Sequence, residues 1–354
     1  MMTCTLDLYT DYLVSSTGPT TATGLSRLLD GALSHDHITR WLSSAQWGSG
    51  QVWRAAKPLI RQAEVQRGAE EFAVLIVDDS ILEKAHTDAN ELICTHWDHR
   101  QQRYVKGLNF VSLLYQAGKL ALPIAVELVR KTVAVWDTKS QQTTYQSPFT
   151  KNEYLQQLLR VAQQQVACRY LLADSWYASA ENMNLVRALG HHFVLALEST
   201  RTVALSEAER AQGQFQAVQS LAFPDTQPLR VYLRAVQEAV LVTRQVFTNQ
   251  DGSQGVLYLV SSDTDLTHRQ LATIYQRRWK VEEYHKSLKQ NASMGKSPTK
   301  TPPTQANHFM AAVLAYTKLE VLKIQCGISH FRLKAQLYAV GLKAMYQQLL
   351  QLSA

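Results

Sequence analysis

The feature that most constrains the fold is an uninterrupted helical stretch from residue 268 to residue 290, HRQLATIYQRRWKVEEYHKSLKQ. It contains no Pro or Gly, so it predicts one long helix. At about 100° of rotation per residue, one face of this helix carries Tyr275, Arg278, Glu282 and Lys289. A separate apolar stripe would dock the helix on the core. The polar face holds a carboxylate between cationic and hydroxyl groups, which suits a phosphate substrate and a metal ion.

Two short apolar runs end in acidic residues. FAVLIVDDS ends in Asp78, Asp79 and Ser80, and RYLLADS ends in Asp174 and Ser175. Each run predicts a buried strand whose carboxyl end meets solvent. Alternation along a strand points Asp78 and Asp79 to opposite faces and cannot decide between them. Together with Glu282 these acids form an all-oxygen ligand set, which favours a hard cation such as Mg²⁺ over zinc.

The order of the predicted elements indicates an α/β fold. After the first strand come a hairpin over residues 108–130, a helix over 151–167, the second acidic strand, a helix over 179–190 and a further strand. Pro123 places the second hairpin strand at a sheet edge or a bulge. Residues 200–266 read as strands, with a hairpin loop at 249–255. Several α/β folds share this alternation, so it does not identify one of them.

The two ends of the chain are predicted to be helical. Residues 21–44 predict two short helices joined by a Gly turn, the pattern of a helix-turn-helix whose second helix would carry His37 and Arg40. An ordinary helical hairpin explains that pattern equally well. Helices over 306–325 and 331–352 close the chain, and their apolar positions indicate packing. The predicted boundaries are 1–70, 71–199, 200–266, 267–300 and 301–354.

Composition adds weaker constraints. A formal charge of +7 and a pI near 9.1 suggest an anionic partner. The four cysteines form no C-x-x-C pair, and no apolar run is long enough to cross a membrane, so a reducing cytoplasm is expected. The segment around His96 and His99 reads as a structural or DNA-contacting loop rather than a zinc site.

The spacing of Tyr275, Arg278, Glu282 and Lys289 resembles the Y-R-E-K motif of bacterial insertion-sequence DDE transposases of the cut-and-paste type. The alternative is a solvated helix whose charges pair at i, i+4. The resemblance implies a ribonuclease H-like catalytic core with a β-rich insertion, a helical N-terminal DNA-binding region and C-terminal helices. It covers nearly the whole chain.

The resemblance also implies a site. The first catalytic Asp of the family precedes a small hydroxyl residue, which selects Asp79 and leaves Asp78 in reserve. Asp79, Asp174 and Glu282 are then expected to be catalytic and to bind Mg²⁺, for which Mn²⁺ would substitute. The expected DNA contacts come from the helix, the basic loop after it and the N-terminal region: Tyr275, Arg278, Lys289, Trp279, Lys296, Arg40 and His37.

The expected function is a DNA transposase that cleaves double-stranded DNA at transposon ends and transfers the strand into target DNA, acting as a homodimer on DNA. Two alternatives remain. One is a domesticated, non-catalytic DNA-binding regulator, and the other is a ribonuclease H-like nuclease that cuts branched DNA without joining strands.

Overall fold

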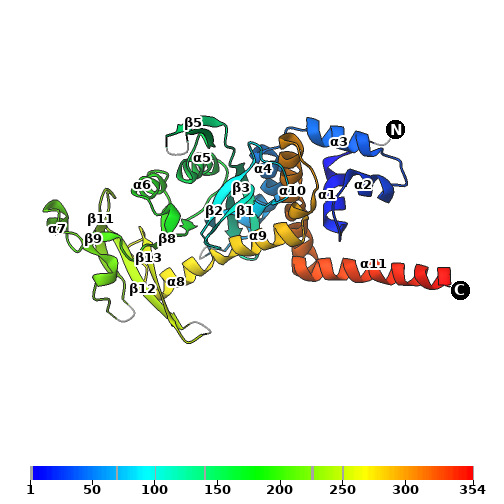
Figure 1. Ribbon diagram of the computed structural model, residues 1–354. Coiled ribbons are helices and arrows are strands. Elements are labelled where there is room, and N and C mark those ends of the chain that lie inside the picture. Colours follow the sequence, from blue (N-terminus) through cyan, green and yellow to red (C-terminus); the bar gives the residue numbers. More distant parts are fainter. Residues whose placement is uncertain are drawn as a thin grey trace.

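The computed structural model describes residues 3–68, 71–99, 101–138, 141–224, 227–248 and 251–353. The protein is a mixed α/β molecule in which helices cover both faces of one large sheet (Figure 1). In the described part of the chain, no helix is long and apolar enough to cross a membrane.

The large sheet joins the predicted core strands to the predicted insertion. Its order is β10-β9-β11-β12-β13-β8-β7-β1-β3-β2, with β4 paired to β3. The core strands are β1 (Val74–Glu83), β2 (Ile93–Asp98), β3 (Arg103–Ala117), β4 (Leu120–Leu128), β7 (Tyr170–Ala173) and β8 (His192–Leu197). β1 pairs antiparallel with β3 and parallel with β7, and β7 pairs parallel with β8.

The predicted β-rich stretch contains β9 (Thr202–Ala204), β10 (Gln216–Ala217), β11 (Leu229–Leu233), β12 (Val240–Thr248) and β13 (Gln254–Ser261). β13 pairs with β8, so these strands extend the core sheet. Part of the predicted 249–255 loop lies outside the described residues. Two elements here were not predicted: α7 (Glu207–Ala211) and the 3-10 turn η2 (Val218–Ser220).

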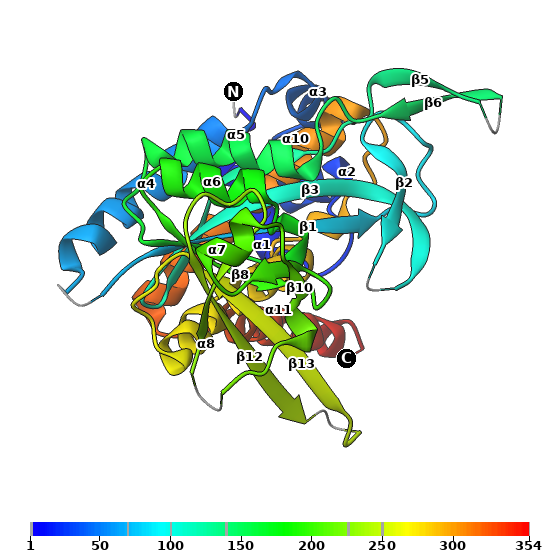
Figure 2. The same cartoon turned by 90° about the vertical axis from the view of Figure 1, so that its left-hand side faces the viewer.

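Residues 108–130 form the predicted hairpin of β3 and β4, and the pairing register shifts between Leu113 and Leu114, beside Pro123. The prediction of an edge strand or bulge there is confirmed. A separate hairpin of β5 (Val133–Asp137) and β6 (Gln142–Gln146) follows and stands away from the sheet (Figure 2). It was not predicted.

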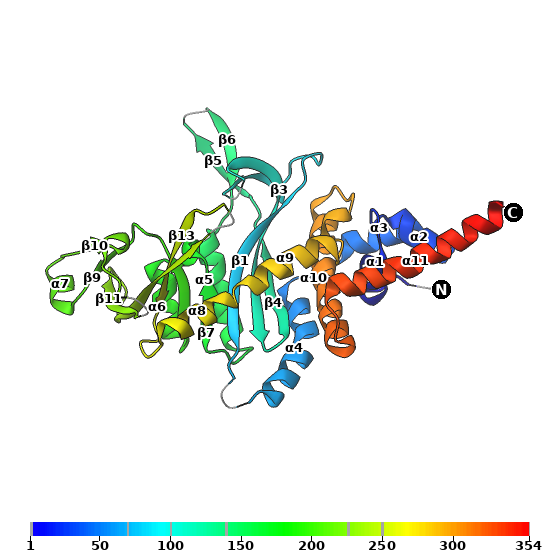
Figure 3. The same cartoon turned by 90° about the horizontal axis from the view of Figure 1, so that it is seen from below.

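The helices are α1 (Leu6–Ser15), α2 (Ala22–Leu28), α3 (His35–Ser44), α4 (Ser49–Gln66), α5 (Lys151–Gln163), α6 (Ala180–Ala188), α8 (His268–Gln276), α9 (Trp279–Gln290), α10 (Pro302–Cys326) and α11 (His330–Ser353). The 3-10 turns η1 (Ser175–Tyr177) and η3 (Met294–Lys296) follow β7 and α9. α8 and α9 cross one face of the core sheet (Figure 3), while α5 and α6 cover the other.

Alternation along β1 divides the apolar core into two layers. Val74 and Ile76 pack with α9, α10 and the N-terminal helices, whereas Leu75 and Val77 pack with α5 and α6. A one-residue step along β1 therefore moves a side chain from one layer to the other.

Two sequence predictions need correction. The single helix over 268–290 is divided between α8 and α9, because Arg278 and Val281 donate to carbonyls three residues back instead of four. The first acidic strand does not end at its acids either. β1 continues to Glu83 because β3 keeps pairing with it, whereas its pairing with β7 stops at Ile76.

Candidate active site

Asp78 and Asp79 lie on β1 at the point where β7 no longer covers its edge. β1 pairs with β7 as far as Ile76, which lies opposite Leu172. Asp78 and Asp174 each come two residues later, so they lie at the same height in the sheet. Asp78 and Asp79 thus lie beyond the part of β1 with which β7 pairs. The parallel pairing of β1 and β7 brings the two acidic segments to the same level of the sheet.

Asp79 faces the layer of α5. Its carboxylate lies 2.7 Å from Nζ of Lys151, the first residue of α5, and accepts a 3.2 Å hydrogen bond from the hydroxyl of Tyr177. The Asp79 side chain is largely buried. A cation and a hydroxyl group therefore hold this carboxylate at the sheet edge.

Asp78 faces the layer of α9. Its carboxylate lies 3.9 Å from the Arg278 guanidinium and 4.0 Å from Nδ1 of His285. Burial, together with the negative charges of Asp174 and Asp79, raises the pKa of Asp78 to about 7. Only part of its charge is balanced, because the Arg278 guanidinium is nearly 4 Å away.

Asp174 directly follows β7 and caps η1 by accepting a 3.1 Å hydrogen bond from the Trp176 backbone N–H. Burial and the charge of Asp79 raise its pKa. Three carboxylates of β1 and β7 therefore repel one another at this end of the sheet. Carboxylate oxygens are the ligands that divalent cations such as Mg²⁺ prefer.

Glu282 stands apart from those three acids. It lies on α9, is partly exposed, and pairs with Arg278 at 2.8 Å. Arg278 thus lies between Glu282 and Asp78 and contacts both. The predicted face of the helix is formed, because the turn between α8 and α9 keeps Tyr275, Arg278 and Glu282 together.

No three His, Cys, Asp or Glu side chains of the described ranges are arranged to hold one metal ion. Carboxylate oxygens fit a hard cation. Glu282, however, is ion-paired with Arg278 and does not lie with the aspartates. Lys151 and Arg278 supply the positive charge near these carboxylates.

The two aromatic residues predicted on the helix differ in exposure. Tyr275 is buried, and burial raises the pKa of its hydroxyl to about 12, so it stays protonated and can donate a hydrogen bond. Its ring lies 5.8 Å from the guanidinium carbon of Arg278. Trp279, by contrast, is 58% exposed at the first turn of α9, where it is accessible to a ligand.

The predicted lysines contact main-chain carbonyls or hydroxyls. Nζ of Lys289 donates to the Ser80 hydroxyl at 3.0 Å and to the Ile81 carbonyl at 3.3 Å, which ties the end of α9 to β1 beyond the aspartates. Lys296 in η3 donates to the Thr17 carbonyl at 3.1 Å. Lys289 therefore contacts the strand that carries Asp78 and Asp79, whereas Lys296 contacts the segment between α1 and α2.

Arg40 and His37 lie on α3, and that helix packs chiefly on α10 and α2 (Figure 3). The Arg40 side chain is exposed and donates to the main-chain carbonyl of Asp36 in its own helix. The structure therefore groups these two residues on the N-terminal helices, away from the carboxylate cluster.

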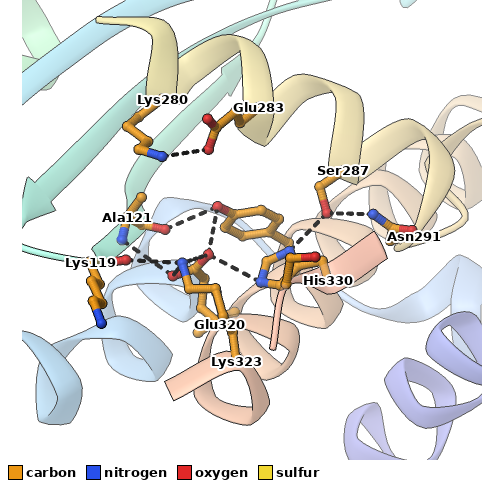
Figure 4. A network of polar contacts seen from close by, with 12 residues as sticks. Lys119, Ala121, Lys280, Glu283, Ser287, Asn291, Glu320, Lys323 and His330 are labelled. Atoms are coloured by element: carbon orange, nitrogen blue, oxygen red, sulfur yellow. Dashed lines mark hydrogen bonds and ion pairs between the residues drawn. The ribbon is translucent and has the colours of Figure 1, made fainter. Parts of the chain in front are cut away.

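The second half of α9 is anchored by a buried polar network (Figure 4). Ser287 shares a 2.9 Å hydrogen bond with Nδ1 of His330, whose Nε2 lies 3.1 Å from the carboxylate of Glu320. Glu320 also pairs with Lys323 and accepts from the Ala121 N–H of β4. These contacts fix α9 relative to α10, α11 and the sheet.

Sequence reasoning missed Lys151, Tyr177 and Arg277. Lys151 and Tyr177 contact Asp79, and Arg277 donates to the carbonyls of Phe72 and Gln116 beneath the helix break. Only Tyr177 gave a local signal, because it lies three residues after Asp174. The other two are surface-type residues whose partners are distant in sequence.

No curated protein matches the chain in sequence. The sequence model of the family described as "Transposase DDE domain" matches residues 71–318, which include every strand of the large sheet, α8, α9 and most of α10. That match covers well over half of the 354 residues. The chain therefore belongs to the DDE transposases, the family that includes the transposases of insertion sequences.

Proposed function

We propose that the protein cleaves DNA at the ends of an insertion sequence and transfers the released strand into target DNA. The observation that carries this proposal is the convergence of carboxylates from β1 and the end of β7, with Lys151 of α5 beside Asp79 and Arg278 of the α8–α9 turn beside Asp78. Transposases act on DNA, and those of the DDE type generally use divalent metal ions. The order β1, β3–β4 hairpin, α5, β7, α6, β8 and α8–α9 supports a ribonuclease H-like core.

Asp79, Asp174 and Glu282 are proposed as the catalytic carboxylates that would hold Mg²⁺, with Mn²⁺ as a substitute. Divalent cations would supply an activated oxygen nucleophile and neutralise charge on the phosphate. Asp79 is favoured because it directly precedes Ser80, and the resemblance implies a first catalytic Asp that precedes a small hydroxyl residue. Asp78 is the competing choice, because it lies on the same side of the sheet as Glu282.

Arg278, Lys289 and Tyr275 are proposed to contact phosphates near the scissile bond. Arg278 would do so by exchanging its carboxylate partner for a phosphate, which also frees Glu282 to join the aspartates. The planar guanidinium of Arg can donate two hydrogen bonds to one phosphate, and the ammonium of Lys supplies a compact positive charge. Trp279 at the start of α9 is proposed to contact DNA as well.

The remaining DNA contacts are assigned to the N-terminal helical region. Arg40 is exposed on α3 and His37 is partly so, as a helix that meets the DNA backbone requires. Lys296, which donates to the Thr17 carbonyl between α1 and α2, is proposed as a further DNA contact. The double-stranded DNA of transposon ends is the proposed ligand, and the cytoplasm is the proposed site of action.

A homodimer is proposed, and α11 supports it. This helix of 24 residues projects from the body (Figures 1 and 3). One set of its apolar residues recurs at gaps of four and three, the spacing of a two-stranded coiled coil, and every member of the set is exposed: Tyr338, Leu342, Met345, Leu349 and Leu352. A second copy of the same helix would cover this stripe along about 20 Å of its length.

A metal-dependent nicking assay on DNA that carries the element's terminal sequence tests the activity. Asp174→Asn and Glu282→Gln should lower the cleavage rate by about a thousandfold or more while end binding persists. Glu283→Gln is the matched control, because Glu283 is exposed and pairs only with Lys280 among the described side chains. Cutting by Glu282→Gln at the rate of Glu283→Gln would contradict the assignment of Glu282.

Asp79→Asn and Asp78→Asn compared in the same assay assign the first carboxylate. Loss of cutting with Asp79→Asn and retention with Asp78→Asn is the expected outcome, and the reverse would transfer the role to Asp78. Wild-type protein that binds the ends without cutting would indicate a regulator. Cutting of branched DNA without joined products would indicate a nuclease.

A further inference from the structure

Four aromatic rings form a continuous row that starts beside Asp174. The ring centroids of Trp176 and His99 are 5.2 Å apart, those of His99 and Trp97 are 6.3 Å apart, and those of Trp97 and Tyr104 are 4.9 Å apart. Trp176 belongs to η1, while the other three belong to β2, β3 and the turn between them. We call Trp176, His99, Trp97 and Tyr104 the aromatic row.

The row is not part of the apolar core. Trp176 is 52% exposed, Tyr104 is 69% exposed and Trp97 is 39% exposed. Trp97 and Tyr104 face each other across the β2–β3 pair, and cross-strand packing alone explains that contact. It does not explain Trp176, which comes from another segment and extends the row toward the carboxylates.

The inner end of the row is attached to the active site. The Trp176 backbone N–H donates to Asp174, and Nζ of Lys151 lies 5.5 Å from the Trp176 ring while it pairs with Asp79. A phosphate held near these aspartates would therefore place the next nucleotide beside Trp176. Lys151 provides positive charge at the same point.

The arrangement of the rings indicates which form of DNA fits. Bases in a duplex are stacked at about 3.4 Å along each strand and their faces are covered by neighbouring bases. Neighbouring rings of the row are tilted or edge-to-face, with interplanar angles of 50° to 85°, so they do not continue a parallel base stack, and the exposed rings can only stack on base faces that are free. Aromatic side chains beside a positive charge are the usual platform for unpaired strands.

We propose that the aromatic row binds the unpaired bases of the DNA strand that adjoins the scissile phosphate. This inference rests on the proposed function for its biological meaning. The row would hold the strand open next to the carboxylates, and its ligand class is single-stranded DNA of any sequence, because every base has a face that can stack.

Binding without metal tests the row independently of catalysis. Fluorescence anisotropy of a short labelled poly-dT strand is measured in EDTA at constant ionic strength with wild-type protein, Trp176→Ala and Trp97→Ala. Each variant should weaken binding by about fivefold to a hundredfold, the range for loss of one stacked base, while affinity for blunt duplex DNA changes less than about twofold. Trp176→Phe keeps a ring and should restore most of the affinity.

Trp136→Ala is the matched control, because Trp136 is 61% exposed but lies on the separate β5–β6 hairpin. An equal loss with Trp136→Ala, or no loss with Trp176→Ala and Trp97→Ala, would overturn the inference. A second readout is 2-aminopurine in a single-stranded overhang, whose fluorescence should be quenched by wild-type protein and not by Trp176→Ala.

The two proposals can fail separately. Wild-type protein that cuts DNA while the row variants bind poly-dT normally would refute the row and keep the transposase function. If wild-type protein binds poly-dT through the row but does not cut DNA with any divalent metal, the proposed catalysis is refuted and the proposed single-strand binding by the row stands.

Discussion

Two adjacent residues, Asp78 and Asp79, belong to different surroundings because a strand turns successive side chains to opposite faces. Asp79 meets Lys151 and Tyr177 beneath α5, and Asp78 meets Arg278 and His285 beneath α9. Each aspartate is thus next to a different helix. A substrate that draws Arg278 away would change the charge around Asp78 more directly than that around Asp79.

Gly107 gives the first residue-scale prediction. A Cβ atom there would lie 2.3 Å from the carbonyl oxygen of Leu82, so β1 and β3 approach closely only because residue 107 lacks a side chain. Gly107→Ala should lower the free energy of unfolding by about 1 to 3 kcal/mol, measured by urea denaturation. It should also weaken cleavage, because Ser80 and Ile81, which hold Lys289, lie just before Leu82.

Gly50→Ala is the control for this substitution, because nothing lies within 4 Å of its added Cβ and residue 50 is helical. It should leave stability unchanged or raise it by up to about 1 kcal/mol. Equal effects of the two substitutions would show that the close approach of the strands is unimportant.

At the scale of elements, α1 docks on α10 through a buried histidine. The Tyr9 hydroxyl shares a 2.9 Å hydrogen bond with Nδ1 of His308, and Nε2 of His308 lies 3.2 Å from the Ser293 carbonyl oxygen. Burial lowers the pKa of His308 to about 4. The histidine is therefore neutral in the folded protein at neutral pH.

This lowered pKa predicts acid sensitivity. The unfolded chain takes up the proton near pH 6.5 and the folded chain near pH 4, so the free energy of unfolding falls as pH drops between those values. His308 alone should account for a loss of about 2 kcal/mol between pH 7 and pH 5. His308→Gln should remove that part of the pH dependence in urea denaturation, and an unchanged pH profile would contradict it.

α11 differs from the packing helix that its sequence predicted. Its apolar stripe is exposed because the helix leaves the body after residue 334. Leu342→Lys should shift the protein from dimer to monomer in sedimentation without DNA, since it puts a charge in the stripe. Gln347→Lys adds the same charge off the stripe and should have no effect. A wild-type protein that is monomeric at micromolar concentration would refute pairing through α11.

At the scale of the whole molecule, the repulsion among Asp78, Asp79 and Asp174 links metal binding to stability. A cation that binds only the folded cluster stabilises the fold. MgCl₂ should raise the thermal unfolding midpoint by a few degrees, whereas KCl of equal ionic strength should not. Asp174→Asn should abolish the rise. An equal rise in that variant would place the bound metal elsewhere.

The sequence predicted the elements whose signals are local. Apolar runs that are buried in the sheet became β1 and β7, and Pro123 lies beside a register shift on an outer strand. Local capping residues also fix where helices begin. Thr150 and Glu153, for example, form a capping box at the start of α5. The spacing of Tyr275, Arg278 and Glu282 predicted a shared face, which persists because the turn at Arg278 remains helical.

By itself, then, the sequence determined most of the strands and helices and which residue types carry the chemistry, because such signals lie within one or two helical turns or strand residues. Only the tertiary structure decided that Lys151 pairs with Asp79, that Arg278 lies between Glu282 and Asp78, and that β13 extends the core sheet. These contacts depend on strand register and on how layers pack. A one-residue change in register would give each side chain different neighbours.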